Sequence, residues 1–204
     1  MLTPDDMSTM NMAALRKVRM QESARNVRLF LNTHTPAGYD GWKKVFTTTM
    51  PEQVKNIIAA FVTGNNTTLA ICCSENDIRQ VCCLAAAERL ISLGITSSWL
   101  WGSVAELVSE SSNNFWAIPQ QWVTTDLLIL DISPTDMPLP EAAKRNINII
   151  IRNRIDKKKK TILLCSDNPT TQHGKENWGM VNATTIDHMA YNTSWCFANN
   201  IAMP

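Results

Sequence analysis

Short apolar segments alternate with segments of helical pattern along most of the 204-residue chain. Near-continuous apolar runs predict buried strands at 67–74, 96–102, 125–133 and 160–168. The intervening pattern predicts helices at 77–94, 103–111 and 140–156, and another helix at 51–63 precedes the first strand. Strands that alternate with helices form a parallel sheet with helices on both faces. The predicted fold class is therefore α/β, a three-layer sandwich of one core domain plus a short extra segment.

A further helix is expected at residues 11–31, before the alternating segments begin. Its apolar residues recur at helical spacing and form one stripe, with Met20, Ala24, Val27 and Leu31 preceded by Leu15. The helix is also basic, because only Glu22 opposes Arg16, Lys17, Arg19, Arg25 and Arg28. Residues 32–41 are turn-rich and indicate a linker, which divides the chain into a helical arm (1–35) and a core domain (36–204). The stripe docks either on its own domain or on another protein or nucleic acid.

The turn after the first predicted strand stands where a phosphate-binding loop would be expected. Such a loop needs glycines that let the backbone wrap phosphates, a lysine that reaches them and a hydroxyl that holds magnesium. The turn at 73–80 begins with Cys73 and Ser74 and contains no glycine. Arg79 stands in the lysine position and Gln80 in the hydroxyl position, so the site is degenerate. An ordinary turn that never bound phosphate is the alternative interpretation.

Two strand ends could complete such a site. The strand at 125–133 contains Asp131 after an apolar run, a Walker B pattern whose aspartate would organise the magnesium shell. Ile132 replaces the second acid that would orient water. After the strand at 160–168, Asp167 or Asn168 could take the place of the residue that touches the γ-phosphate. The Asn168 amide could contact phosphate, whereas the Asp167 carboxylate would repel it.

The formal net charge of +1 gives no global sign of a polyanionic partner, so any nucleic-acid surface must be local. The candidate is a basic run in a helix and the loop after it: Arg152, Arg154, Lys157, Lys158, Lys159 and Lys160. These residues could bind the backbone of single-stranded DNA. A solvated loop whose charges precede an apolar strand is the other interpretation.

The composition excludes several classes of protein. No run of eighteen apolar residues occurs, and the N-terminus lacks the basic-then-apolar order of a secretory signal. We therefore expect a cytoplasmic protein, in a bacterial cell or a phage-infected host, with no membrane partner. The six cysteines are expected to be buried reduced thiols. Neither they nor the three histidines show metal-ligand spacing, so no metal site is predicted.

Taken in order and spacing, these segments resemble the bacterial DnaC-type helicase loaders, AAA+ P-loop ATPases that place the hexameric DnaB helicase on DNA. The resemblance runs from about Met20 to Asn199 and includes the segments 69–90, 96–110, 126–131, 145–168, 185–189 and 192–195. It implies a RecA-like/AAA+ fold and a helicase-docking role for the N-terminal arm. In that family a helix near the end carries an arginine finger, and His188 stands in its place here.

Glycines, lysine, hydroxyl, second acid and finger are thus all altered. Since phosphoryl transfer depends on positioned charge, we expect no ATP hydrolysis and neither ATP nor magnesium as a bound cofactor. The resemblance implies a replication protein that binds a DnaB-type helicase and assists its loading, and the altered site residues imply that it does so without ATP control. The basic run makes single-stranded DNA a second candidate partner. The alternatives are a decoy that blocks the host helicase or its loader, an unconventional ATPase that uses Arg79, and an ATPase subunit of the transposition type.

Overall fold

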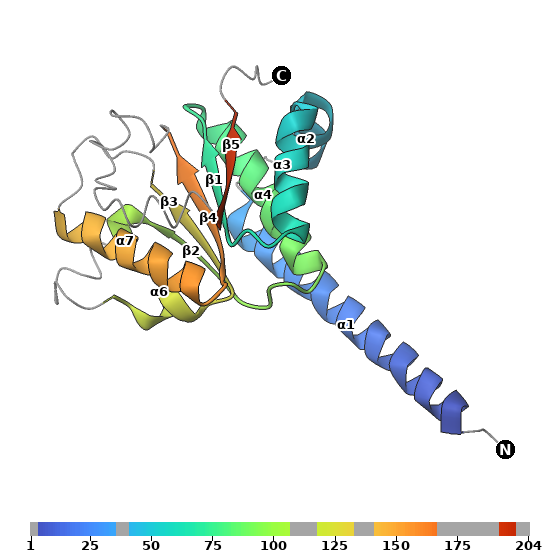
Figure 1. Cartoon of the computed structure of the whole chain (residues 1–204). Coiled ribbons are helices and arrows are strands. Elements are labelled where there is room, and N and C mark those ends of the chain that lie inside the picture. Colours follow the sequence, from blue (N-terminus) through green and yellow to red (C-terminus); the bar gives the residue numbers. More distant parts are fainter. Residues whose placement is uncertain (1–3, 36–40, 107–117, 133–140, 167–191, 199–204) are drawn as a thin grey trace.

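The computed structural model describes residues 4–35, 41–106, 118–132, 141–166 and 192–198 (Figure 1). The helices in these ranges are α1 (Pro4–His34), α2 (Trp42–Thr49), α3 (Glu52–Thr63), α4 (Asn76–Ser92), α6 (Gln120–Thr124) and α7 (Glu141–Asp156). The strands are β1 (Thr68–Cys72), β2 (Trp99–Ser103), β3 (Leu127–Asp131), β4 (Lys160–Cys165) and β5 (Thr193–Phe197). Each strand expected from the sequence is present, whereas α2, α6 and β5 were not predicted.

The described strands form one five-stranded sheet in the order β2-β3-β4-β1-β5, and every neighbouring pair is parallel. β4 lies between β1 and β3, so Cys72 pairs with Cys165, and Asp131 with Leu164. The four apolar residues of β3 that precede Asp131 are fully buried, as expected for a strand covered on both faces. The parallel α/β sheet predicted from the sequence is confirmed.

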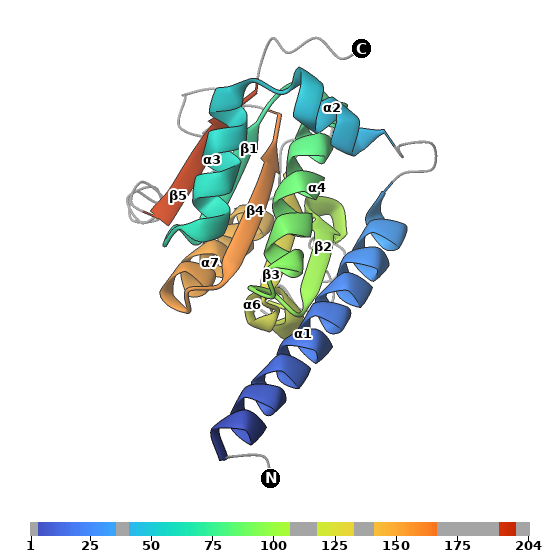
Figure 2. The ribbon, with the colours of Figure 1, turned by 90° about the vertical axis from the view of Figure 1, so that its right-hand side faces the viewer.

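Helices cover both faces of the sheet and make a three-layer sandwich (Figure 2). One face carries α3 and α4, with α1 and α2 packed against α4. The other face carries α6 and α7 (Figure 1). Alternate strand residues supply the two cores because successive side chains point to opposite faces: Leu69 and Ile71 belong to the first core, and Ala70 and Cys72 to the second.

Local signals in the sequence explain several helix ends. The Ser103 hydroxyl accepts from the Glu106 N–H (3.2 Å), and the Glu106 carboxylate accepts from the Ser103 N–H (2.7 Å), which confirms the predicted capping box. Gly94 has a φ of +67° just after α4, where the N–H groups of Gly94 and Ile95 donate to the carbonyls of Ile91 and Leu90. Pro51 was predicted to be the first residue of this helix, but it is the residue before α3, so the helix begins one residue later, at Glu52.

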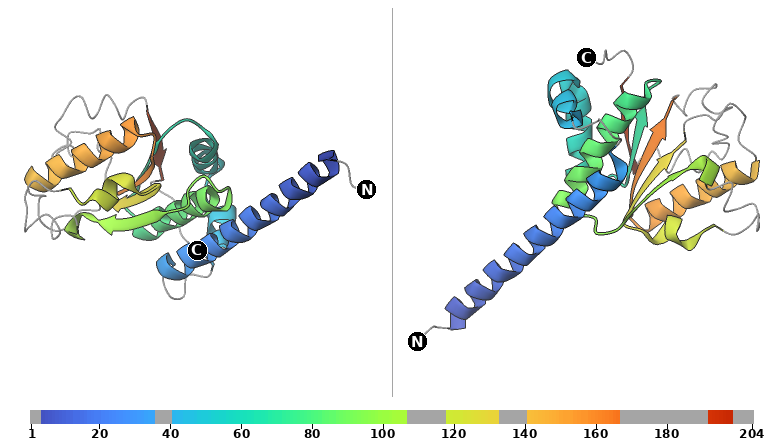
Figure 3. Two further views of the ribbon diagram at one scale, coloured as in Figure 1. Left: turned by 90° about the horizontal axis from the view of Figure 1, so that it is seen from below. Right: turned by 180° about the vertical axis from the view of Figure 1, so that it is seen from behind.

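The N-terminal helix α1 has two parts of different environment. Residues 23–34 contain the buried and half-buried side chains of the helix and pack mainly along α4, whereas the described side chains of residues 12–22 are exposed on the portion of the helix that leads away from the body (Figure 3). We call these the anchored part and the projecting part. The prediction of a linker at 32–41 is wrong for its first residues, because helix α1 continues through His34. No helix within the described residues is long and apolar enough to cross a membrane.

Candidate functional site

The carboxyl ends of β1, β3 and β4 bring the predicted nucleotide-site segments to one edge of the sheet. Because these three strands are parallel and adjacent, the turn after β1, Asp131 and Ser166 all lie at this edge. This is the edge at which open α/β sheets bind their ligands. Asn168 and His188, which the sequence singled out, lie outside the described residues.

Arg79 occupies the lysine position of the degenerate loop, but its side chain turns back into the loop. The residue is buried, and its guanidinium donates to the carbonyls of Cys73 and Ser74, the latter at 3.0 Å. A second guanidinium nitrogen donates to the Asn76 side-chain oxygen at 3.3 Å. In a phosphate-binding loop the backbone presents N–H groups and the cation reaches the ligand. Here the cation is engaged by backbone carbonyls, so Arg79 holds the turn in place.

The remaining loop residues also disfavour phosphate. Ser74, Glu75 and Asp77 are exposed, which keeps two carboxylates at the surface where phosphates would sit. Ile78 takes the last glycine position and is fully buried in the core beneath α4. Gln80, in the place of the magnesium-binding hydroxyl, is half-buried. The turn is therefore held by a buried apolar residue, Ile78, and by the internal cation of Arg79.

Asp131 ends β3 as the Walker B pattern predicts, and it is half-buried. Ile132, where an active ATPase carries its second acid, is 3% exposed and packs in the core beside α7. Its N–H donates to the Leu164 carbonyl at 2.9 Å, which continues the strand pairing past Asp131. The position of the second acid is thus part of the core and does not face a ligand.

All six cysteines are free and buried, as the sequence predicted. Burial raises the pKa of the Cys73 thiol, which donates to the Ala198 carbonyl at 3.1 Å. Burial also raises the pKa of Cys83 well above its ordinary value, and the nearby Asp131 charge acts in the same direction. These thiols therefore remain protonated and serve as small apolar side chains.

Some cations of the basic run form hydrogen bonds inside the protein, and others lie at the surface. Arg154 is fully buried and donates to the carbonyls of Trp122 (3.1 Å), Thr125 (2.9 Å) and Lys160 (2.6 Å), and to the Thr161 hydroxyl (2.9 Å). Burial lowers its pKa to about 10, so it stays charged at neutral pH. The prediction that Arg154 contacts DNA is wrong, because its donors are used inside the protein.

The prediction that Lys160 binds DNA is also wrong, because its ammonium group is bound inside the protein. Its ammonium donates to the carbonyls of Phe61 (2.9 Å), Gly64 (3.1 Å) and Asn66 (2.7 Å), and burial lowers its pKa. Lys159 is half-buried and forms an ion pair with Asp126 at 2.7 Å, a bond that holds the pKa of that carboxyl well below its usual range. Arg152, Lys157 and Lys158 are the members of the run that remain candidates for DNA.

The predicted docking stripe on α1 contains residues that pack against the protein's own core and residues that are exposed. Val27 and Leu31 are half-buried against the core, where the neighbouring Phe30 is fully buried. The Phe30 ring meets Trp99 edge-on at 5.8 Å and stacks with Trp101 at 6.3 Å. The prediction of Val27 and Leu31 as docking residues is therefore wrong, since they fix the helix to its own domain.

Other apolar residues of α1 are exposed. Leu15, Met20 and Ala24 of the predicted stripe face solvent. Met12, Leu15 and Val18 form a second exposed row, which was not predicted. The spacing of three residues in this row was the available signal. Arg16, Lys17 and Arg19 are exposed beside it. An unpaired apolar row flanked by cations therefore stands on the projecting part of α1.

Known proteins are similar to this chain in structure. No family model matches it, and no curated protein does. A crystal structure of the DnaC helicase loader has a TM-score of 0.55 at 12% identity and covers 74% of this chain and 94% of that chain. The chain has the fold of a DnaC-type helicase loader.

Two further structures agree with this assignment of the fold. A primosome component from Streptococcus pyogenes serotype M3 has a TM-score of 0.56 at 11% identity and covers 80% of this chain and 91% of that chain. The crystal structure of DnaI has a TM-score of 0.50 at 14% identity and covers 74% of this chain and 81% of that chain. The predicted RecA-like/AAA+ fold is thus confirmed.

Proposed function

We propose that this chain is a cytoplasmic DNA replication protein that binds a hexameric DnaB-type replicative helicase and assists its loading onto DNA without hydrolysing ATP. The observation that carries the proposal is a projecting helix, on a domain with the fold of the helicase loaders, whose exposed apolar row lies beside Arg16, Lys17 and Arg19. Structures whose names include a helicase loader and a primosome component support the process, and the projecting helix supports the mode of binding.

The projecting part of α1 has the composition of a helix that enters a groove on another protein. Met12, Leu15 and Val18 are 53–59% exposed, so their apolar area is not used by the domain itself. Groove-binding helices present apolar residues at intervals of three and four. The exposed arginines and lysine beside the row would steer the helix toward an acidic surface.

Binding without ATP turnover is supported by the degenerate loop. Arg79 is engaged by loop carbonyls, Ile132 is in the core, and Glu75 and Asp77 are exposed at the loop. Each of these differs from what phosphoryl transfer requires. We expect ATP with magnesium to bind more weakly than about 1 mM, roughly 4 kcal/mol of affinity. Calorimetric titration measures this, and a micromolar dissociation constant contradicts the pseudo-ATPase proposal.

Helicase binding is tested by changing the exposed row. The double variant Leu15→Asp with Val18→Asp should abolish binding to a purified DnaB-type helicase in a calorimetric or interferometric assay. Its melting midpoint should stay unchanged because both positions are exposed. Ile149→Asp is the matched control, since Ile149 is an exposed apolar residue on α7, far from α1. Undiminished binding of the double variant contradicts the proposed docking surface.

Loading is distinguished from inhibition by the effect on the helicase. The chain should increase unwinding of a duplex annealed to a circular single strand when helicase and circle are mixed with it. A decrease in unwinding, with binding intact, would instead assign the chain as a decoy of the helicase.

Single-stranded DNA is the second proposed partner, through Arg152, Lys157 and Lys158. Changing these three residues to alanine should weaken binding to an oligonucleotide and flatten its dependence on salt. Unchanged binding over a salt series would remove DNA from the list of partners.

A further inference from the structure

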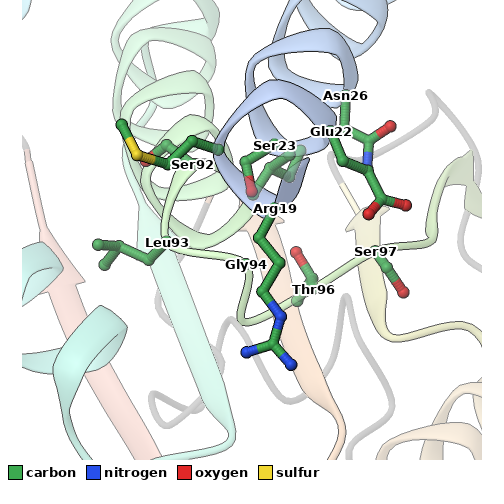
Figure 4. Close-up of a pocket in the computed structure, with 11 residues that line it drawn as sticks. Arg19, Glu22, Ser23, Asn26, Ser92, Leu93, Gly94, Thr96 and Ser97 are labelled. Atoms are coloured by element: carbon green, nitrogen blue, oxygen red, sulfur yellow. The ribbon is translucent and has the colours of Figure 1, made fainter. Parts of the chain in front are cut away.

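A hollow of about 390 Å³ lies where the projecting part of α1 leaves the body (Figure 4). One wall is α1 from Arg19 to Asn26, and the opposite wall is the end of α4 with Leu93. The floor is the turn from Gly94 to Ser97 that leads into β2. The hollow exists because the body ends at this turn while α1 continues past it.

The rim of this hollow is apolar and exposed. Met20 is 73% exposed on the α1 wall, and Leu93 is 57% exposed on the α4 wall. Ile95, next in the turn, is also exposed. Met20 precedes Val27 on the same helix by two turns and therefore lies on the same side of it. The apolar stripe that packs the anchored part against the core thus continues to the hollow. Large apolar groups gathered on two elements around a depression mark an interaction surface.

The α1 wall also carries hydrogen-bond donors. Arg19 extends from α1 across the turn at Gly94 and Thr96, whereas Glu22 lies to the other side near Asn26 (Figure 4). Ser23 and Asn26 follow Arg19 by one and two turns of the helix and line the same hollow. Arg19 is thus the cation best placed to meet an anionic group that enters.

The charge of α1 selects among possible occupants. Between residues 12 and 34, five exposed basic side chains face a single acidic one, Glu22. A second copy of this segment, laid against the hollow, would bring like charges together, which costs free energy. An acidic helix with one apolar face would instead match both the cations and the rim formed by Met20 and Leu93.

We propose that this hollow is a second, separate part of the helicase interface and receives an acidic amphipathic helix of the helicase. A carboxylate of that helix pairs with Arg19, and its apolar residues cover Met20 and Leu93. The identity of the partner rests on the proposed function, whereas the hollow, its rim and its charge belong to this structure. The partner is then held at two places, the exposed row of α1 and the base of the same helix.

Site-specific photo-crosslinking tests this arrangement with the full chain and a purified DnaB-type helicase. A benzophenone amino acid is placed at Leu93, at Leu15 or, as a control, at Ile149, all of which are exposed. We expect helicase adducts from Leu93 and Leu15 and none from Ile149, with the Leu93 adduct on a helicase segment rich in Asp, Glu and apolar residues. Adducts from Leu15 alone would contradict the proposal that the hollow binds the helicase, and they would still support the proposed function.

Other outcomes of the crosslinking are equally decisive. Absence of adducts from both Leu15 and Leu93 overturns the proposed function together with the hollow. An adduct from Leu93 to a second copy of this chain assigns the hollow to self-association and overturns the helicase helix. An adduct on a helicase segment without acidic residues overturns the pairing with Arg19.

The charge pairing has its own test. Arg19→Glu should weaken helicase binding by about tenfold or more, and Arg28→Glu, on the same helix but outside the hollow, should weaken it much less. Circular dichroism checks that both variants fold. Equal weakening by the two variants means that the helix acts only by general electrostatic steering, which overturns a specific carboxylate at Arg19.

Discussion

Two groups of basic residues resemble each other in the sequence and differ in the structure. The group at the end of α7 and the start of β4 includes Arg154 and Lys160, whose donors are bound to backbone carbonyls inside the protein. The group on α1 includes Arg16, Lys17 and Arg19, which are exposed on a helix that projects from the body. Arg154, Lys159 and Lys160, half of the dense basic run, are thus held inside the fold, whereas the dispersed cations of α1 are exposed to a partner.

The difference has a geometrical cause. At the amino-terminal edge of β1, β3 and β4, the ends of α3 and α6 and the turns that enter the strands present carbonyl groups to these cations. The five N–H donors of an arginine can satisfy several such carbonyls at once, and a lysine can satisfy three. A helix that projects has its carbonyls bound internally and offers no such partners. Surroundings, and not the number of charges, decide what a cation does.

Removing the most buried cation should have the largest effect. Arg154→Met should lower the free energy of unfolding by at least about 3 kcal/mol, because several carbonyls lose their donor and each costs about 1–3 kcal/mol. Urea denaturation measures the change. Arg152→Met is the control and should stay within about 0.5 kcal/mol of the native chain. Equal stability of the two variants would remove the distinction between the two groups.

Lys160 should come next. Lys160→Met leaves the carbonyls of Phe61, Gly64 and Asn66 without their common donor and should cost about 1–3 kcal/mol. The neighbouring exposed Lys157→Met should be close to neutral in the same urea titration. A Lys160 variant as stable as the Lys157 variant would mean that water replaces the lysine without cost.

A substitution at Lys158 is expected to increase the stability of the protein. It has a φ of +53° at the end of α7, where its N–H and that of Lys159 donate to the carbonyls of Ile155 and Arg154. Glycine adopts this conformation without strain, so Lys158→Gly should raise stability by up to about 1 kcal/mol. Thermal melting measures it, with Lys157→Gly as the control that gains nothing. A fall in the midpoint of the Lys158 variant would show that this lysine makes a stabilising contact.

The smallest effect on stability is expected on α1. Arg16→Ala with Lys17→Ala should leave the free energy of unfolding within about 0.5 kcal/mol. The same variant should associate more slowly with the DnaB-type helicase that we propose as the partner, and the rate should depend less on salt, because steering charge is lost. Stopped-flow mixing at several salt concentrations measures this. A loss of stability comparable to that of the Lys160 variant would erase the contrast between the two groups.

Much of the fold followed from the sequence, and the exceptions have a physical reason. Apolar runs at 127–130 and 162–165 indicate strands wherever they lie, because such runs are stable only when buried on both sides. β5 was missed because Thr193 and Ser194 interrupt its apolar pattern, and its register is set by pairing with β1. α2 was missed because its three consecutive threonines have low helix propensity, and packing on α4 compensates for it.

The sequence by itself determined which chemical groups the candidate site lacks. No arrangement of the chain can restore glycines to the turn at 73–80 or a carboxylate to Ile132, since residue type is independent of folding. The tertiary structure alone decided that Arg79 turns into its loop, that Arg154 and Lys160 are internal, and that α1 is anchored by Phe30 and exposed at Leu15. Direction and burial depend on which distant segments meet, and spacing along one chain does not contain that information.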